Sequence, residues 1–363
     1  SAAWANTGNS AMDAFAAQTA ELNAVLASSA GQPLKDYVAG VVDDANAAIA
    51  SGDLTSGASV AARQAVGYAL QLAQDAQEDS QYGLWSDTPF IIYDAPAISP
   101  ELRQPSTLPK DGKVSDELRV VSAQNEFEAA SFVIAPVADV ASVTFDINDL
   151  VGDQGTIPSS AIDMHVVKTW YQGGTAWYSY FKDPGKDTLV PELLLHDENL
   201  VLVDHAAKKN FVRVDYPAGS QYVDVSHKPS QPFNRWTEPV EDSPTLLPIA
   251  LTEGESKQMW ITTKVPAGTP GGIYSGTIDI TADGAPAGSL TLTVRVLPFE
   301  LPSPKTYYDL NKDFYVMVYH HARVKDSLAA SGNNVALVEQ SLLNQYRNLA
   351  EHNVLNVPMN TSY

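Results

Sequence analysis

The chain has 363 residues, of which 44% are hydrophobic and 18% are charged, so it is long and apolar enough for two or three folded domains. Its formal net charge of −21 comes from 43 acidic and 22 basic residues without a basic stripe, which argues against nucleic acid and an anionic membrane surface as partners. Cysteine is absent from the sequence, which excludes disulfides, zinc thiolate sites and cysteine nucleophiles.

Residues 9–78 carry apolar side chains at helical spacing in alanine-rich surroundings. Breaks rich in Gly, Ser, Asp and Pro divide this region, and Pro33 is well placed to open a helix. We therefore predict a small antiparallel three-helix bundle over residues 1–82, which we interpret as a spacer. Its predicted helices cover residues 9–28, 33–50 and 57–78.

From residue 85 the pattern changes to short segments that are rich in β-branched and aromatic residues and that often alternate in polarity. Turn residues separate these segments, so we predict an antiparallel β-sandwich over residues 85–302. Within it, residues 182–245 are rich in Pro, Asp and His, and we expect them to form an irregular excursion over one face. The predicted strands cover residues 90–95, 126–135, 142–148, 162–170, 221–226, 257–265, 272–281 and 289–297.

After the sandwich, LPFELPSPKT (297–306) holds three prolines and predicts a stiff linker. The pattern then predicts a strand in DFYVMVYHH (313–321), a helix over residues 335–352 and a second strand in VLNVPMN (354–360). A strand, a helix and a strand in this order open a parallel α/β domain, which we place at residues 306–363. The predicted fold class is therefore multidomain α+β.

A set of sequence pieces occurs in order along residues 85–363: RVVSAQNEFEAASFVIAP (119–136), VPAGTPGGIYSGTIDIT (265–281), LTVRVLPFELPSP (292–304) and the strand–helix–strand start at 313. This ordered set resembles the front half of the family-123 glycoside hydrolases. The resemblance implies a β-sandwich that leads into a (β/α)8 barrel, of which this chain holds only the first β-α-β unit. For the parent protein it implies a retaining, substrate-assisted N-acetylhexosaminidase that uses no metal or organic cofactor.

The resemblance also implies an adjacent Asp-Glu pair at the end of a middle barrel strand, where Asp orients the substrate acetamide and Glu protonates the leaving oxygen. That position falls beyond Tyr363, so we expect the chain itself to be inactive. Two such pairs do occur, Asp116-Glu117 in a polar turn and Asp197-Glu198 after the apolar run LVPELLLH. The second pair suits hydrolysis by residue type, but it lies well before the barrel region, so we favour a structural role for it.

Histidines and carboxylates also gather in a short part of the excursion, at His196, Asp197, Asp204 and His205. Such side chains suit several divalent metal ions. Their spacing is neither helical nor hairpin-like, so nothing in the sequence makes the four converge, and we expect no metal site.

In (β/α)8 enzymes the carboxyl ends of the strands build the active site. The two predicted strands here end in TyrHisHis at 319–321 and in MetAsnThr at 359–361. Tyr, His and Asn side chains hydrogen-bond sugar hydroxyls well, although such residues also close strands for packing alone. We predict that the following residues contact a glycan substrate: Tyr319, His320, His321 and Asn360.

The segment WYQGGTAWYSYF (170–181) concentrates six aromatic side chains around the pair Gly173-Gly174. These rings can fill the sandwich and its interface with the next domain. Alternatively, Trp177 and Tyr178 stand at a loop tip and stack on a sugar ring as part of a glycan subsite, or they contact another chain. The sequence leaves these interpretations open.

We interpret the chain as the N-terminal portion of an exported bacterial glycoside hydrolase, secreted or at the cell surface. No apolar run is long enough to span a bilayer, so we expect no membrane insertion. A two-strand barrel start exposes an apolar edge, which we expect to pair with the missing C-terminal part or with another chain. The alternative is a non-catalytic carbohydrate-binding or structural surface module that uses the aromatic segment 170–181.

Overall fold

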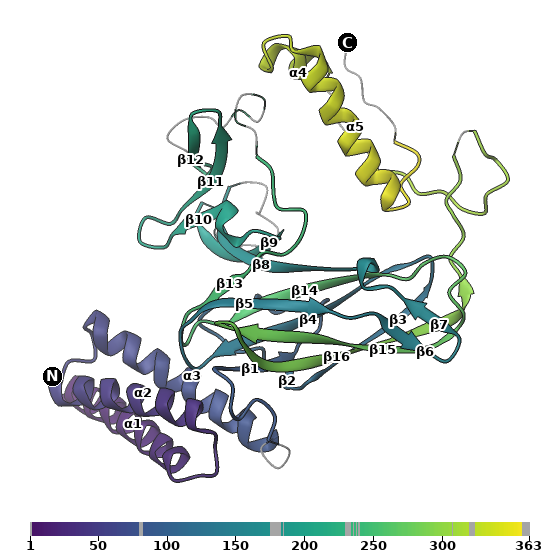
Figure 1. The fold of residues 1–363 in the computed structure, drawn as a ribbon. Coiled ribbons are helices and arrows are strands. Elements are labelled where there is room, and N and C mark those ends of the chain that lie inside the picture. The colour runs from purple at the N-terminus through teal and green to yellow at the C-terminus, as the bar shows by residue number, and fades with distance from the viewer. Residues whose placement is uncertain are drawn as a thin grey trace.

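The computed structural model describes residues 2–79, 83–174, 183, 185–228, 234, 236, 238, 240–306, 308–318 and 324–357. The described chain forms five α-helices and several sheets, which confirms the mixed, multidomain α+β class. Figure 1 shows its parts: a group of helices, a β-sandwich, a small sheet formed by a segment between the sandwich strands β9 and β13, and a C-terminal helical unit.

The N-terminal helices α1 (Ala2–Leu26), α2 (Gln32–Ser51) and α3 (Gly57–Asp79) all contact one another. Local sequence sets the limits of α2, because Pro33 lies in its first turn and Gly52, with φ 67°, takes the left-handed conformation just after its end. Apolar side chains such as Leu22, Val38 and Leu72 are buried between the helices.

The sandwich consists of two sheets packed face to face (Figure 1). We call the six-stranded one the β4 sheet, with the order β2-β1-β4-β14-β8-β9. The seven-stranded one is the β15 sheet, with the order β13-β5-β15-β16-β3, and in it β6 pairs with β15 and β7 pairs with β6. Every ladder in them is antiparallel except the parallel pairing of β16 with β3.

The bounds of the β4 sheet strands are β1 (Phe90–Asp94), β2 (Lys113–Val114), β4 (Phe127–Pro136), β8 (Ile162–Gln172), β9 (Thr188–Leu195) and β14 (Lys257–Lys264). Those of the β15 sheet are β3 (Glu117–Gln124), β5 (Val140–Ile147), β6 (Leu150–Gly152), β7 (Gly155–Ile157), β13 (Ile249–Leu251), β15 (Gly272–Ala282) and β16 (Ala285–Glu300). Strand β3 alternates between buried and exposed residues, as a strand with one solvent face does, whereas the first four residues of β1 are all buried. The difference arises because the helices pack near β1 and β2, so buried apolar side chains form one cluster through the bundle and the sandwich.

Residues 182–245 are expected from their sequence to be irregular, and this expectation is wrong. They contain β9 and a separate three-stranded antiparallel sheet, the small sheet, formed by β10 (Val201–Asp204), β11 (Lys209–Tyr216) and β12 (Gly219–Asp224). Strand β12 overlaps the strand predicted at 221–226, and β11 alternates between buried and less buried residues, so part of this region does follow a strand pattern in the sequence.

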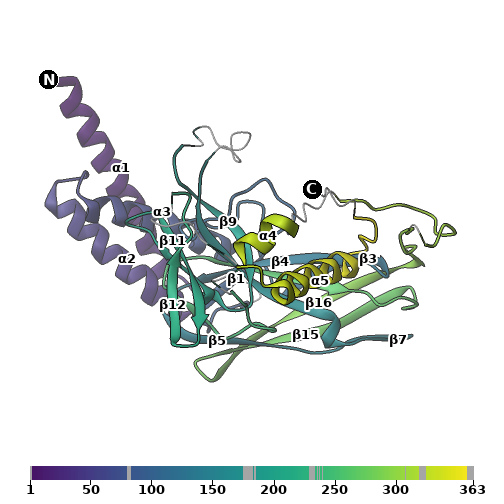
Figure 2. The ribbon, with the colours of Figure 1, turned by 90° about the horizontal axis from the view of Figure 1, so that it is seen from above.

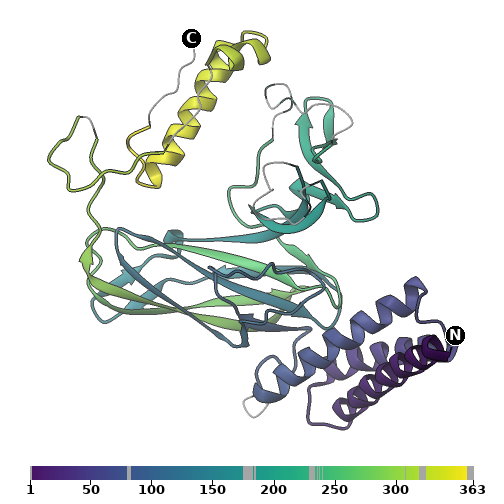
Figure 3. The same ribbon diagram turned by 180° about the vertical axis from the view of Figure 1, so that it is seen from behind.

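The C-terminal unit holds α4 (Val324–Ala330) and α5 (Val335–Glu351). The two strands predicted here lie partly outside the described residues, and their described parts form one parallel β-bridge, between Met317 and Asn356. Figures 1 and 3 show this unit and the small sheet on the same side of the sandwich, and Figure 2 shows the N-terminal helices at one end of it.

Within the described part of the chain, no helix has the length and apolar character needed to cross a membrane.

Candidate functional site

All six predicted glycan contacts fall outside the described residues, so their assignment stays a prediction: Tyr319, His320, His321, Asn360, Trp177 and Tyr178. The start of the aromatic segment is described. Trp170 lies near the end of β8, before Gln172, and its Nε1 donates to Glu192 Oε2 at 2.7 Å, while the Tyr171 hydroxyl lies 3.3 Å from Nδ1 of His205. These first two rings are therefore held by polar partners at the end of the β8–β9 pair.

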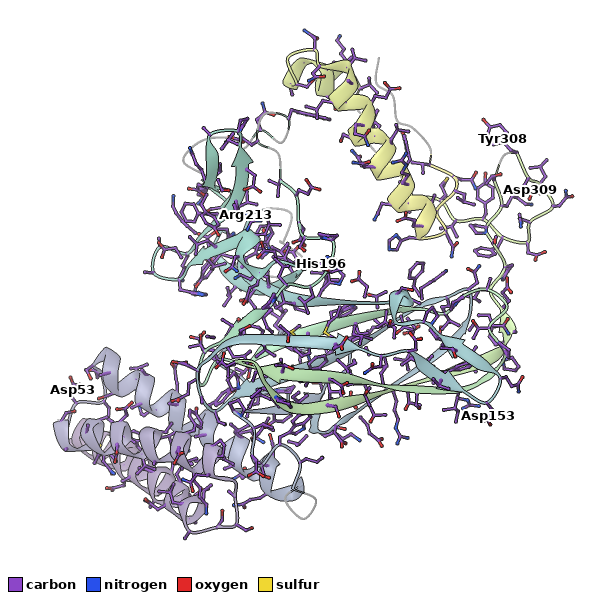
Figure 4. All side chains as sticks on the ribbon, in the orientation of Figure 1. Asp53, Asp153, His196, Arg213, Tyr308 and Asp309 are labelled. Atoms are coloured by element: carbon purple, nitrogen blue, oxygen red, sulfur yellow. The ribbon has the colours of Figure 1, made fainter. Side chains whose placement is uncertain are left out.

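The Asp197 and Glu198 carboxylates both make structural ion pairs and hydrogen bonds. Asp197 is buried, and its Oδ2 accepts from Arg213 at 2.6 Å (labelled in Figure 4), while its Oδ1 accepts from the backbone N–H of Asn199 at 2.9 Å. Glu198 forms an ion pair with Lys257 and accepts from the backbone N–H of Ala250 at 2.8 Å. Because both carboxylates already have charged or backbone partners, neither is poised as a free acid.

The residues of the other pair, Asp116-Glu117, also make structural contacts. Glu117 pairs on the surface with Arg119 at 2.6 Å, and the backbone carbonyl of Asp116 accepts from Thr291 at 2.7 Å, beside the β3–β16 ladder. The hydrogen bonds from Arg119 hold the pKa of the Glu117 carboxyl below its usual range.

The four residues considered for a metal from the sequence do not gather in one place. Asp204 accepts from the backbone N–H of Ala207 at 2.8 Å, Asp197 pairs with Arg213, and His205 faces Tyr171. Among the residues that the structure describes, the set whose ligand atoms do converge is Asp163, His165 and His196, with all ligand atoms within 4.8 Å of one another.

Sheet register explains this convergence. Asp163 and His165 are two residues apart on β8, so their side chains lie on one face of the sheet. The antiparallel pairing of Val166 with Leu195 places His196, just after β9, opposite His165. The imidazole rings of His165 and His196 stack with centroids 4.0 Å apart and an interplanar angle of 15°.

The ring of His196 is fixed at both nitrogens. Nδ1 lies 2.7 Å from the carbonyl oxygen of Ser243, and Nε2 lies 2.8 Å from Oδ1 of Asp163. The Asp242 carboxylate accepts from the backbone N–H groups of His196 and Ser243, each at 2.8 Å, and so holds these two segments together. Since the carbonyl oxygen can only accept, Nδ1 of His196 is the donor in this hydrogen bond, and Nε2 faces the Asp163 carboxylate.

The ring of His165 is mostly buried, but it makes no hydrogen bond with the described residues. Its Nε2 lies 3.7 Å from Asp163 Oδ2, beyond hydrogen-bond distance, and its buried Nδ1 has no hydrogen-bond partner in the described structure. Burial lowers the pKa of the His165 imidazole, although the Asp163 carboxylate opposes this shift. His165 is thus a neutral imidazole with unused donor and acceptor capacity at neutral pH.

A second feature is a groove of about 810 Å³ between the N-terminal helices and the sandwich. Its lining includes Tyr37, Asp44 and Tyr68 from the helices and Glu253 from the sandwich. Burial, together with the Asp139 and Asp44 carboxylates, raises the pKa of the Glu253 carboxyl. The groove is acidic, and Asp163, His165 and His196 do not line it.

Comparison with known proteins gives structural neighbours only. No family model and no curated protein matches the chain. It is similar to a family 123 glycoside hydrolase from Clostridium perfringens, with 15% identity, a TM-score of 0.40 and coverage of 67% of this chain and 32% of that one. The matched part is thus about a third of that hydrolase.

Two further structures are similar to parts of the chain. The PapD-like domain 7 of human CEP192 is 11% identical, with a TM-score of 0.21 and coverage of 56% of this chain and 100% of that one. The N-terminal domain of PorA is 10% identical, with a TM-score of 0.19 and coverage of 58% of this chain and 98% of that one.

The sequence does not single out Asp163 and His165, because they lie in a strand and Asp163 is 33 residues before His196. The available signal was the i, i+2 spacing of an acid and a histidine in a predicted strand, which puts both on one face. Their contact with His196 depends on which strand pairs with β8 and in which register. No local sequence pattern predicts this pairing.

Proposed function

We propose that the chain is the front part of an exported glycoside hydrolase, in which the β-sandwich supports a catalytic (β/α)8 domain that starts near residue 306. The observation that carries this proposal is the parallel bridge between Met317 and Asn356, with α4 and α5 between them. Parallel neighbours joined through a helix are the unit from which a (β/α)8 barrel is built.

The exposed apolar surface of this unit supports the same interpretation. Within α5 the structure buries Val338, while Val335, Leu337 and Leu343 are exposed. Other exposed apolar side chains flank the bridge: Phe314, Met317, Val318 and Leu355. In a complete barrel, neighbouring strands and helices would cover such side chains, because a β-α-β unit alone buries too little to be stable.

The chemistry follows from the sequence resemblance. In the proposed parent enzyme the substrate is an N-acetylhexosaminide, and its own acetamido group attacks the anomeric carbon. The catalytic Asp-Glu pair comes from a later barrel strand, which agrees with the engagement of Asp197 and Glu198 by Arg213 and Lys257. Tyr319, His320, His321 and Asn360 are the proposed glycan contacts, with Trp177 and Tyr178 as a further subsite.

The test compares the 363-residue chain with a version extended through the natural stop of its gene, on a panel of aryl glycosides that includes the N-acetylgalactosaminide. We expect turnover by the extended chain alone. Turnover by the 363-residue chain would overturn the proposal, because the catalytic acids would then already be present. Glycan affinity without turnover by either chain would also overturn it and would favour a carbohydrate-binding module.

A further inference from the structure

We propose that Asp163, His165 and His196 form a binding site for one divalent transition-metal ion of the zinc type, independently of the hydrolase function. The three side chains come from two neighbouring strands and place their ligand atoms within 4.8 Å of one another. Two atoms bound to one ion at about 2.1 Å lie no more than about 4.2 Å apart, so a small side-chain adjustment completes the set.

His196 is already oriented as a ligand. Its Nδ1 donates to the carbonyl oxygen of Ser243 at 2.7 Å, which fixes the ring and directs Nε2 toward Asp163. A histidine that ligates a metal through one nitrogen usually donates the other N–H to a carbonyl or carboxylate in this way. Asp163 Oδ1, at 2.8 Å from Nε2, lies where a neighbouring ligand atom on the same ion would lie.

His165 supplies the adjustable ligand. The rings of His165 and His196 are nearly parallel, so their nitrogen lone pairs do not point at a common position, and one ring must turn to share an ion. No hydrogen bond from the described residues opposes such a turn of His165, because its Nδ1 has no partner among them and its Nε2 is 3.7 Å from Asp163. A bond to a metal would also satisfy a buried polar ring that otherwise lacks a hydrogen bond.

The donor set selects the kind of ion. Two imidazoles and one carboxylate suit Zn²⁺ and similar transition metals, whereas Mg²⁺ and Ca²⁺ prefer sites made of oxygen atoms. Three protein ligands leave one position for water or another ligand. The Asp163 side chain is 55% exposed while the His165 and His196 side chains are 17% and 12% exposed, so an ion can enter from the carboxylate side.

The test is calorimetric titration of Zn²⁺ into the tag-free 363-residue chain after treatment with a chelator. We expect one ion per chain, with affinity lowered about 100-fold or more in His165→Gln and His196→Gln. Co²⁺ bound in place of Zn²⁺ should give a visible absorption spectrum that Asp163→Asn alters, and Mg²⁺ and Ca²⁺ should not compete with Zn²⁺.

Controls come from the remaining histidines. His205→Gln removes an exposed histidine outside the cluster, and His320→Gln/His321→Gln removes the adjacent pair; both variants should bind Zn²⁺ like the wild type. His165→Gln serves as the variant that should fold normally, which circular dichroism checks, since its ring makes no hydrogen bond with the described residues. Absent Zn²⁺ binding, unchanged binding by His165→Gln, or loss of binding with the 320–321 pair would overturn the proposal.

Discussion

At the scale of single residues, the buried Asp197 and the partly buried Lys168 make structural contacts between segments. The Asp197 carboxylate is buried, and both of its oxygens are occupied, one by Arg213 and one by the backbone N–H of Asn199. Lys168 donates to the backbone carbonyl of Glu198 at 3.0 Å, and burial lowers the pKa of its ammonium group. These contacts fasten the small sheet and the segment that follows β9 to the β4 sheet.

We predict that Asp197→Asn lowers the free energy of unfolding by about 2 kcal/mol, because it leaves the partly buried Arg213 with only the more distant Asp215 at 3.5 Å. Urea denaturation followed by circular dichroism measures this loss. Asp153→Asn, in an exposed turn at the far end of the sandwich (Figure 4), is the control and should change stability by less than about 0.5 kcal/mol. A large loss of turnover in the extended enzyme with unchanged stability would instead assign Asp197 to catalysis.

A second residue-scale prediction concerns Asp111, which accepts from the buried Arg103 at 2.7 and 3.2 Å. The Arg103 guanidinium holds the pKa of the Asp111 carboxyl below its ordinary value of about 3.9. A lowered pKa in the folded state means that the pair stabilises the protein above this ordinary value and stops doing so as the pH falls through the lowered one.

Asp111→Asn should therefore destabilise the protein by about 2 kcal/mol near neutral pH and by less at about pH 3, which is below the ordinary pKa of the carboxyl in the unfolded chain. The measurement is the free energy of unfolding of both proteins at the two pH values. An equal difference at both would show that charge pairing with Arg103 is not the cause.

At the scale of elements, the start of β16 and the segment before β1 are in close contact at Gly288 and Trp85. Gly288 in β16 has φ 101°, and a Cβ atom there would lie 2.7 Å from the Trp85 ring. Trp85 is itself buried, and its Nε1 donates to the carbonyl of Ser115 at 3.1 Å. The ring thus fills a space that exists because residue 288 has no side chain.

Gly288→Ala should destabilise the protein by about 3 kcal/mol, from backbone strain at positive φ and from contact with the Trp85 ring. Thermal unfolding measures it. Gly155→Ala is the matched control, because a Cβ atom at that strand position meets no atom within 4 Å and its effect should stay below about 0.5 kcal/mol. Similar losses in both variants would contradict the proposed fit.

Elements whose limits depend on local chemistry were predictable from the sequence. The helix predicted at 33–50 is α2, Gln32–Ser51, because proline and glycine mark its two ends. The strand predicted at 126–135 is β4, Phe127–Pro136, because a long apolar strand keeps its pattern when it is buried. The Asp163–His196 contact was not predictable, since it depends on pairing between segments distant in sequence. The small sheet is instead built from two consecutive hairpins, and its strand β12 overlaps the strand predicted at 221–226.

At the scale of the whole molecule, the helices and the sandwich are joined by side chains from both. The Tyr93 hydroxyl donates to Asp75 at 2.9 Å, and burial raises the pKa of the Tyr93 phenol. The hydroxyls of Tyr68 and Ser256 lie 2.8 Å apart. The C-terminal unit differs, because α5 has one buried residue, Val338.

We therefore predict one calorimetric transition for the helices and sandwich together. A chain that starts at residue 83 should melt about 5 °C or more below the full chain, because β1 loses its cover. A chain that ends at residue 306 is the control and should melt close to the full chain. If both truncations leave the main transition unchanged, the helices are an independent spacer.

The long strand β16 has a mechanical consequence for the protein. It lies between β15 and β3, pairs in parallel with β3 from Thr291 to Val296, and ends at Glu300, inside the proline-rich segment 297–306. A force applied to the chain beyond that segment acts along the strand axis. Hydrogen bonds on both sides of β16 then resist together in shear, rather than opening one after another from an end. We therefore expect the sandwich to resist a pull from its C-terminal side through both neighbours of β16.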